Sequence, residues 1–146
     1  METINKLKNY LIKILILFLI GGTIYYCTEM LCRGHSHYSM FILGGIDFLL
    51  IGAINEYIDW NMKLLHQAII GSGIITITEF ITGYIVNLKL HLEIWDYSNL
   101  PLNILGQICL PFSLLWIAVS LLAIILDDYI RYWIFDEEKP HYNYKI

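Results

Sequence analysis

Four carboxylic acids stand inside long apolar stretches of the sequence, namely Glu29, Asp47, Glu56 and Glu79. A charged side chain at the centre of a bilayer costs at least ~2.5 kcal/mol, so such residues usually meet an ion, a solute or another charge. Glu29 has a ready partner, because Arg33 follows it at the i, i+4 spacing of a helical ion pair. Asp47 and Glu79 each lie about 12 Å from the outer end of their predicted membrane spans, at ~1.5 Å per residue, so we expect them to share one layer.

His35, His37 and His91 are the residues that could join these carboxylates as metal ligands. His35 and His37 form an H-x-H pair, and imidazole with carboxylate is a donor set for zinc and other transition metals. One H-x-H pair does not specify a metal site, since histidines in loops are commonly solvated or hydrogen-bonded. The sequence therefore predicts no metal and no other cofactor, with these histidines as the candidates if a metal is bound.

Motifs for catalysis are missing from the sequence. It has no G-x-x-x-x-G-K-[ST] phosphate loop, no H-E-x-x-H and no G-x-S-x-G. The chain is therefore not predicted to be an enzyme. If it works with an ATPase, that ATPase is expected to be another chain. The formal net charge of -4 and the lack of a Lys/Arg cluster interleaved with aromatic residues exclude nucleic acid as a predicted partner.

The elements that position the carboxylates are predicted to be membrane helices. Of the 146 residues 58% are hydrophobic and 15% are charged, against ~25% charged in soluble domains. Crossing ~30 Å of hydrocarbon takes ~20 apolar residues, and a helix satisfies its own backbone groups in lipid. The apolar segments predict four spans in a single domain, at about residues 10–32, 40–58, 64–87 and 107–126. Short loops make neighbouring spans antiparallel, so the predicted fold class is all-α, a four-transmembrane-helix bundle.

The basic residues predict how the bundle is oriented in the membrane. With the amino terminus in the cytoplasm, the inner side carries seven Lys and Arg residues and the outer side carries two, Arg33 and Lys89. We therefore expect a multi-pass protein of the cell membrane with both termini cytoplasmic. The polar tail at 136–146 is expected to fray into the cytoplasm.

The segment from 88 to 106, between the third and fourth spans, is longer than the other loops. Its apolar and polar residues alternate from Leu88 to Trp95, a pattern that indicates a strand in water. A lone strand leaves its edges unpaired, so we expect an extended or amphipathic segment lying on the membrane interface. Asn99, just before Leu100 and Pro101, is typical of a helix start and predicts a short dipping helix before the fourth span.

Small and hydroxylated residues recur at helical spacing on the last two spans. The two stripes are Ala68, Ser72, Thr76, Glu79 and Gly83 on the third span, and Cys109, Ser113, Trp116, Ser120, Ala123 and Asp127 on the fourth. Such stripes either pack helices closely or line a path for a solute, and the sequence leaves both interpretations open. The second span is polar on two opposite sides, marked by Asp47 and Glu56, which favours a central position and hence a homo-oligomer.

Three stretches of the chain resemble a known family. They are Glu29 with the run Arg33-Gly34-His35-Ser36-His37-Tyr38-Ser39-Met40 into Leu43-Gly44-Gly45; Glu79 with Thr82-Gly83 and Asn87; and Trp95-Asp96-Tyr97-Ser98 with Pro101-Leu102-Asn103, Gly106-Gln107-Ile108-Cys109 and Phe112-Ser113 to Trp116. Together they are similar to the bacterial ABC-transporter type IV, CmpB-like family. The resemblance implies a multi-pass, permease-like membrane subunit whose ATPase is another chain, and it carries over no catalytic residue.

The candidate pocket for a small solute or ion combines carboxylates that are unfavourable inside a membrane with residues of these family-like stretches. Its predicted members are Glu29, Arg33, His35, Asp47, Glu79 and Asp96. A hypothesis from another class is a structural or regulatory membrane subunit whose buried carboxylates serve packing. The predicted partners are the lipid bilayer, a solute or ion, and either further copies of the chain or a membrane or ATPase subunit.

Overall fold

The computed structural model describes residues 1–145, apart from the side chain of Glu2, and it is helical. The helices are α1 (Glu2–Arg33), α2 (Tyr38–Gly52), α3 (Ile54–Tyr57), α4 (Leu64–Gly83), the π-helix η1 (Tyr84–Lys89) and α5 (Leu110–Phe135). Among the described residues no strand forms. Four stretches are long and apolar enough to cross a membrane: Thr3–Arg33, Tyr38–Tyr57, Leu64–Lys89 and Leu110–Phe135. The predicted all-α fold with four membrane helices is confirmed.

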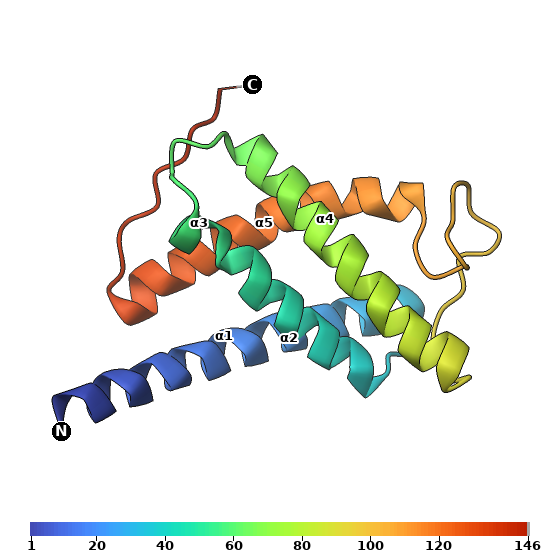
Figure 1. Ribbon diagram of the computed structural model, residues 1–146, viewed down its shortest axis with the longest axis horizontal. Helices are drawn as coiled ribbons and strands as arrows, with labels where there is room; N and C mark the ends of the chain where they lie inside the picture. The colour runs from blue at the N-terminus through green and yellow to red at the C-terminus, as the bar shows by residue number, and fades with distance from the viewer. Residues whose placement is uncertain (146) are drawn as a thin grey trace.

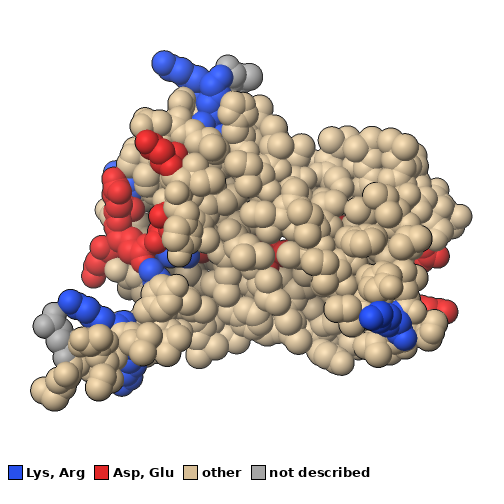
Figure 2. All heavy atoms as spheres, in the orientation of Figure 1, with Lys and Arg blue, Asp and Glu red and all other residues tan. Residues whose placement is uncertain are grey.

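The four long helices run alternately up and down (Figure 1). Both termini and the connection from α3 to α4 lie at one end of the molecule, which we call the terminal end. The turn between α1 and α2 and the segment 90–109 lie at the other, which we call the loop end. Figure 2 shows Lys, Arg, Asp and Glu side chains gathered toward the ends, with a mostly uncharged middle between them. This distribution is the one that a bilayer-spanning protein requires.

Helix α2 is the most enclosed of the four membrane helices. It packs against α1 on one side and contacts α4 and α5 on the other. Glycines let α1 and α2 approach closely, since a Cβ at Gly44 would collide with Tyr25, and one at Gly21 would collide with Phe48. Asp47 accepts a hydrogen bond from Thr78 of α4, and Glu56 lies 3.7 Å from Arg131 of α5. Both polar sides of this span thus have partners within one chain, and the polarity no longer requires a second copy.

Two helices extend beyond the predicted spans at the terminal end. α1 begins at Glu2 rather than near residue 10, and α5 continues to Phe135 rather than ending near residue 126. The fourth helix continues because its charged residues Asp127, Asp128 and Arg131 are buried by protein instead of lying in lipid. Burial beside polar partners removes the cost that placed the predicted boundary there.

The predicted short helix in the segment between the third and fourth spans is wrong. No helix occurs from 90 to 109, and the backbone turns on side-chain hydrogen bonds instead. The Asn103 amide donates to Ser98 O at 3.2 Å and to Leu100 O at 2.9 Å, and its oxygen accepts from Gly106 N at 3.1 Å. Asn side chains that bond the nearby backbone in this way compete with helix formation.

The carboxyl-terminal tail also differs from expectation, because it is docked and does not fray. Asn143 accepts a hydrogen bond from Leu64 N at 3.0 Å and donates to Asn61 O at 2.9 Å. The Trp60 ring stacks on His141 with 4.8 Å between ring centres. These contacts tie the tail to the loop before α4, which composition alone does not predict.

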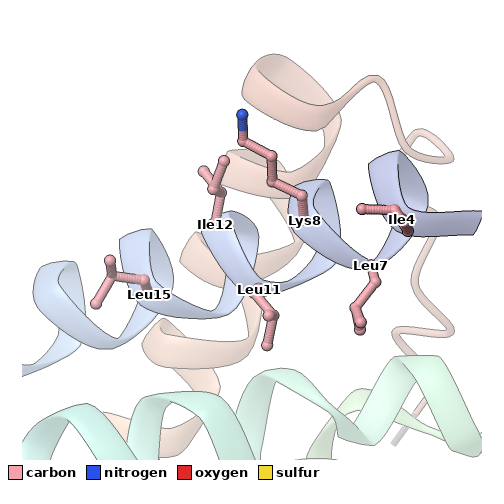
Figure 3. A pocket seen from close by; sticks show the side chains of 6 residues that line it. All are labelled: Ile4, Leu7, Lys8, Leu11, Ile12 and Leu15. Carbon is pink, nitrogen blue, oxygen red and sulfur yellow. The ribbon is translucent and has the colours of Figure 1, made fainter. Parts of the chain in front are cut away.

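Two surface hollows lie near the amino-terminal half of α1. The first, of about 400 Å³, is lined by residues of this helix alone: Ile4, Leu7, Lys8, Leu11, Ile12 and Leu15. Figure 3 shows these side chains pointing away from one helix in several directions. The second, of about 430 Å³, lies between α1 and the residues Phe135 and Glu137. Neither hollow contains Asp47 or Glu79, and an apolar face on an outer membrane helix suits lipid.

Candidate functional site

Glu79 is the centre of a polar cluster in the interior of the bundle. Its side chain lies on α4 and is 2% exposed. The hydroxyl of Tyr97 donates to Glu79 Oε1 at 3.0 Å, and the indole Nε1 of Trp116 donates to Glu79 Oε2 at 3.0 Å. Three elements, α4, the segment 90–109 and α5, thus meet at one carboxylate.

Tyr97 connects the segment 90–109 to this carboxylate. Its ring stacks on Phe112 of α5, with 4.7 Å between ring centres and 15° between planes. Burial, followed by the negative charge of Glu79, raises the pKa of Tyr97 above its ordinary value of 10.0. The phenol therefore keeps its proton and acts as a donor.

Asp47 of α2 lies at the same level as Glu79. It is 6% exposed and accepts a hydrogen bond of 2.6 Å from the hydroxyl of Thr78, the residue before Glu79. The two carboxylates are close enough to interact electrostatically. In the described part of the chain, neither has an ion pair with Lys or Arg.

Tyr25 of α1 faces the same group of acids. It interacts electrostatically with Glu29, Asp47 and Glu79, and its ring centre lies 6.5 Å from that of Trp116. The sequence interpretation did not select Tyr25, because an aromatic residue within an apolar span is usually part of the core. Its neighbours on other helices are what place it at this cluster.

Glu29 and Arg33 form the predicted i, i+4 ion pair, with 3.0 Å between Oε1 and Nη1. Ser36 donates to the other oxygen of Glu29 at 2.7 Å, and Arg33 donates to Ile94 O at 2.7 Å. Arg33 therefore links α1 to the segment 90–109. Its charge is matched by Glu29, which leaves Asp47 and Glu79 without a balancing cation.

His35 and Asp96 do not join this cluster. Both are exposed, and His35 Nδ1 lies 3.1 Å from Arg33 O. Asp96 Oδ1 accepts hydrogen bonds from the hydroxyl of Ser98 at 2.5 Å and from Ser98 N at 2.8 Å. These bonds hold the pKa of Asp96 below its ordinary value of 3.8. Asp96 thus shapes a turn of the loop.

The other histidines have local roles or lie apart. His37 caps α2 by accepting a hydrogen bond from Ser39 N, and His91 is exposed on a backbone with a φ of 53°. Within residues 1–145, no group of three or more His, Cys, Asp or Glu side chains is arranged to hold a metal ion. The structure brings together Glu29, Arg33, Asp47 and Glu79 of the predicted pocket.

Buried amide groups hold the segment 90–109 against the bundle. Gln107 Oε1 accepts from Asn87 Nδ2 at 2.8 Å, and Gln107 O accepts from Trp95 Nε1 at 3.0 Å. Asn87 Oδ1 in turn accepts from Ile94 N at 2.7 Å. The residues of the third family-like stretch are thus those that fix Tyr97 above Glu79.

The small-residue stripes of α4 and α5 face each other. Ser72 donates to Ser113 O at 2.6 Å, and Thr76 donates to the Ser113 hydroxyl at 3.1 Å. A Cβ added at Gly71 would come 2.7 Å from Ser120 Oγ. A polar seam therefore runs along the interface of α4 and α5 from Glu79 toward the terminal end.

A second polar cluster lies at the terminal end, around Arg131. Its Nε lies 2.5 Å from Asp127 Oδ2, and its Nη1 lies 3.7 Å from both Glu56 Oε1 and Glu137 Oε2. Lys13 of α1 also pairs with Glu137, at 2.5 Å. Sequence reasoning selected Glu56 and Asp127 but not Arg131 as their partner, although the i, i+4 spacing of Asp127 and Arg131 was a signal for it.

One protein family matches the chain along almost its entire length. The model of the family described as "Putative ABC-transporter type IV" matches residues 2–142. The chain belongs to this family. As a member of this family with four apolar helices, it is a multi-pass membrane protein. The family is described as a transporter-type component and not as a known class of enzyme. Comparisons with curated proteins and with solved structures each found no match.

Proposed function

We propose that this ABC-transporter type IV protein is a permease-like membrane subunit that binds a small cation between Asp47 and Glu79. ATP hydrolysis would be supplied by a separate partner chain, since the sequence has no phosphate-binding loop. The observation that carries the proposal is that both carboxylates are buried in membrane helices without a Lys or Arg partner among the described residues.

A contrast within the same molecule supports this function. The buried Asp127 at the terminal end has Arg131 at 2.5 Å, as expected of a carboxylate that serves structure. Asp47 has one hydroxyl donor, and Glu79 has two neutral donors. Neutral donors stabilise a carboxylate but do not balance its charge, so two neighbouring acids in low dielectric favour uptake of positive charge.

The segment 90–109 acts in this proposal as the cover of the binding site. Four non-glycine residues of this segment have a positive φ, namely His91, Glu93, Leu102 and Leu105. Each such residue costs of order 1–3 kcal/mol, a strain that persists only where the surroundings impose it. The hydrogen bond from Tyr97 to Glu79 is the contact of the cover with the site itself, and it would have to break for a cation to enter from the loop end.

The cation is expected to be monovalent. Divalent metal ions take six or more oxygen ligands or a set of His and Cys side chains. Asp47 and Glu79 provide two carboxylates, and the rings of Tyr25, Tyr97 and Trp116 stand around them. A pair of carboxylates beside hydroxyl groups suits an organic ammonium ion as well as an alkali-metal ion.

The proposal is tested by thermal unfolding of the purified protein in detergent, with a panel of chloride salts at constant ionic strength. The panel contains Na⁺, K⁺, choline and ethanolammonium. At least one cation should raise the midpoint of unfolding in a saturable way, because a ligand that binds the folded state stabilises it. The shift should disappear in Asp47→Asn and in Glu79→Gln and remain in Glu93→Gln, which changes an exposed acid of the cover.

A panel that shifts the midpoint of no protein, or shifts all four proteins alike, would exclude this function. In that case the second function, a structural or regulatory subunit, would be favoured. The observation on its side is that both oxygens of Glu79 already accept hydrogen bonds inside the chain. That function predicts a stoichiometric protein partner after purification in mild detergent.

A further inference from the structure

Three buried oxygens near the terminal end have no hydrogen-bond donor within the chain. They are Asn55 Oδ1, Gln67 Oε1 and Asp127 Oδ1, and a fourth orphan, Ser120 Oγ, lies deeper on α5. Asn55 is 7% exposed, and Gln67 and Asp127 are fully buried. The large majority of buried polar atoms have a hydrogen-bond partner, so a group of orphans in one region is a candidate binding site.

The orientation of the two amides is determined by their nitrogens. Asn55 Nδ2 donates to Asp128 Oδ2 at 2.6 Å, and Gln67 Nε2 donates to Met62 O at 3.1 Å. Turning either amide over would place oxygen against oxygen. The carbonyl oxygens of both side chains therefore point away from these acceptors and stay available.

The three oxygens come from elements that pack around one hydrophobic cluster. Ile54, Leu64 and Ile124 belong to that cluster. Asn55 follows Ile54 on α3, Gln67 lies one turn after Leu64 on α4, and Asp127 lies one turn after Ile124 on α5. The bond from Asn55 to Asp128 brings α3 directly against this part of α5.

The charges of this region are unequal. Four carboxyl groups, those of Asp127, Asp128, Glu56 and Glu137, lie here with two basic side chains, Arg131 and Lys13. A water molecule has two hydrogens and cannot satisfy three acceptors, whereas a cation is attracted by all three. Arg131 already contacts Asp127 through the other oxygen, Oδ2, so a divalent ion would meet strong repulsion there.

We propose that Asn55 Oδ1, Gln67 Oε1 and Asp127 Oδ1 bind one alkali-metal cation, Na⁺ or an ion of similar size. Two amide carbonyls and one carboxylate form the all-oxygen donor set that hard cations prefer. This site is separate from the one between Asp47 and Glu79, and it lies toward the other end of the seam of α4 and α5. The ion would hold α3, α4 and α5 together at the terminal end.

The test is thermal unfolding of the full chain in detergent, in NaCl and in choline chloride at equal ionic strength, with Asp47→Asn/Glu79→Gln measured in parallel because choline has no first site in that variant. Na⁺ should raise the midpoint of the wild type by roughly 5 °C or more at saturation, with a hyperbolic dependence on concentration. Gln67→Met removes one ligand at similar volume and should abolish the shift. Ser72→Ala, which loses the buried hydrogen bond to Ser113 O, is the matched control. Its midpoint of unfolding should be lower than that of the wild type, but Na⁺ should raise it by the same amount.

Binding of ²²Na⁺ to Asp47→Asn/Glu79→Gln, which lacks the first site, is expected at one ion per chain and keeps the proposal testable if Gln67→Met does not fold. Absence of both ²²Na⁺ binding and a Na⁺-dependent shift would overturn it, as would an unchanged shift in Gln67→Met. The double variant Asp47→Asn/Glu79→Gln should retain the Na⁺ effect. If that double variant loses it while Gln67→Met keeps it, Na⁺ binds at the first site and this second site is refuted.

Discussion

Removing the hydroxyl of Tyr97 should destabilise the protein by an amount that follows from its single buried contact. Tyr97→Phe deletes the donor 3.0 Å from Glu79 Oε1 and leaves the ring able to stack on Phe112. The buried carboxylate oxygen then has no donor, which costs about 1–3 kcal/mol. At roughly 3 °C per kcal/mol for a chain of this length, the midpoint of thermal unfolding should fall by about 3–9 °C.

A double-mutant cycle isolates this contact from other effects of the substitution. Glu79→Leu removes the acceptor, so Tyr97→Phe in that background should cost almost nothing or restore some stability. The coupling energy between the two positions should therefore be about 1–3 kcal/mol. Glu93→Gln, in the same loop but exposed, should combine with Tyr97→Phe additively within about 0.5 kcal/mol.

The measurements are unfolding midpoints of the four purified proteins of each cycle in one detergent. An equal cost of Tyr97→Phe in the wild-type background and in the Glu79→Leu background would refute the reasoning. It would mean that the segment 90–109 is held in place without the hydrogen bond to Glu79, and that Tyr97 does not close the site.

Three further predictions concern other parts of the molecule. Arg131→Met leaves the fully buried Asp127 without its cation and should destabilise the protein by about 3–5 kcal/mol, whereas Lys139→Met on the exposed tail should change unfolding little; equal effects would show that the Arg131 cluster is not structural. Gly52→Ala places a Cβ against the carboxylate of Asp127 and should cost about 1–3 kcal/mol in thermal unfolding, while Gly73→Ala, with open space around its Cβ, should be neutral or stabilising by up to about 1 kcal/mol; a harmless Gly52→Ala would contradict the close packing of α2 on α5. The pKa of Asp96 is lower in the folded protein than its ordinary 3.8, so its stabilising effect is present at neutral pH and is lost as the pH falls below about 4; midpoints measured from pH 7 to pH 3 should show the wild type and Asp96→Asn converging at the acid end, and a constant difference would refute the role of the Asp96 carboxylate.

Hydropathy predicts the four membrane helices because lipid leaves the backbone no alternative to a helix. The ion pair of Glu29 and Arg33 was predictable for a similar reason, since helical spacing alone brings the two side chains together. Counting residues from the span ends placed Asp47 and Glu79 in one layer, and Asp47 indeed contacts Thr78, the neighbour of Glu79. All these features depend on local geometry within straight helices.

The partners of the carboxylates were less accessible to sequence reasoning. Tyr97 reaches Glu79 because buried amides and turns fold the segment 90–109 back onto the bundle. Arg131 contacts Glu56 of α3, which is far away in sequence, and Glu137 of the tail. Neither the loop path nor the docking of the tail leaves a periodic signal, and both are set by contacts between distant segments.

The most direct test of the central claim is a measurement of cation binding by isothermal titration calorimetry. It uses the purified protein and a cation whose thermal shift is lost in Asp47→Asn and in Glu79→Gln. The wild type should bind one cation that Asp47→Asn/Glu79→Gln does not bind, and Glu93→Gln should bind it as the wild type does. If the double variant binds this cation with the same stoichiometry and affinity as the wild type, Asp47 and Glu79 do not form its binding site.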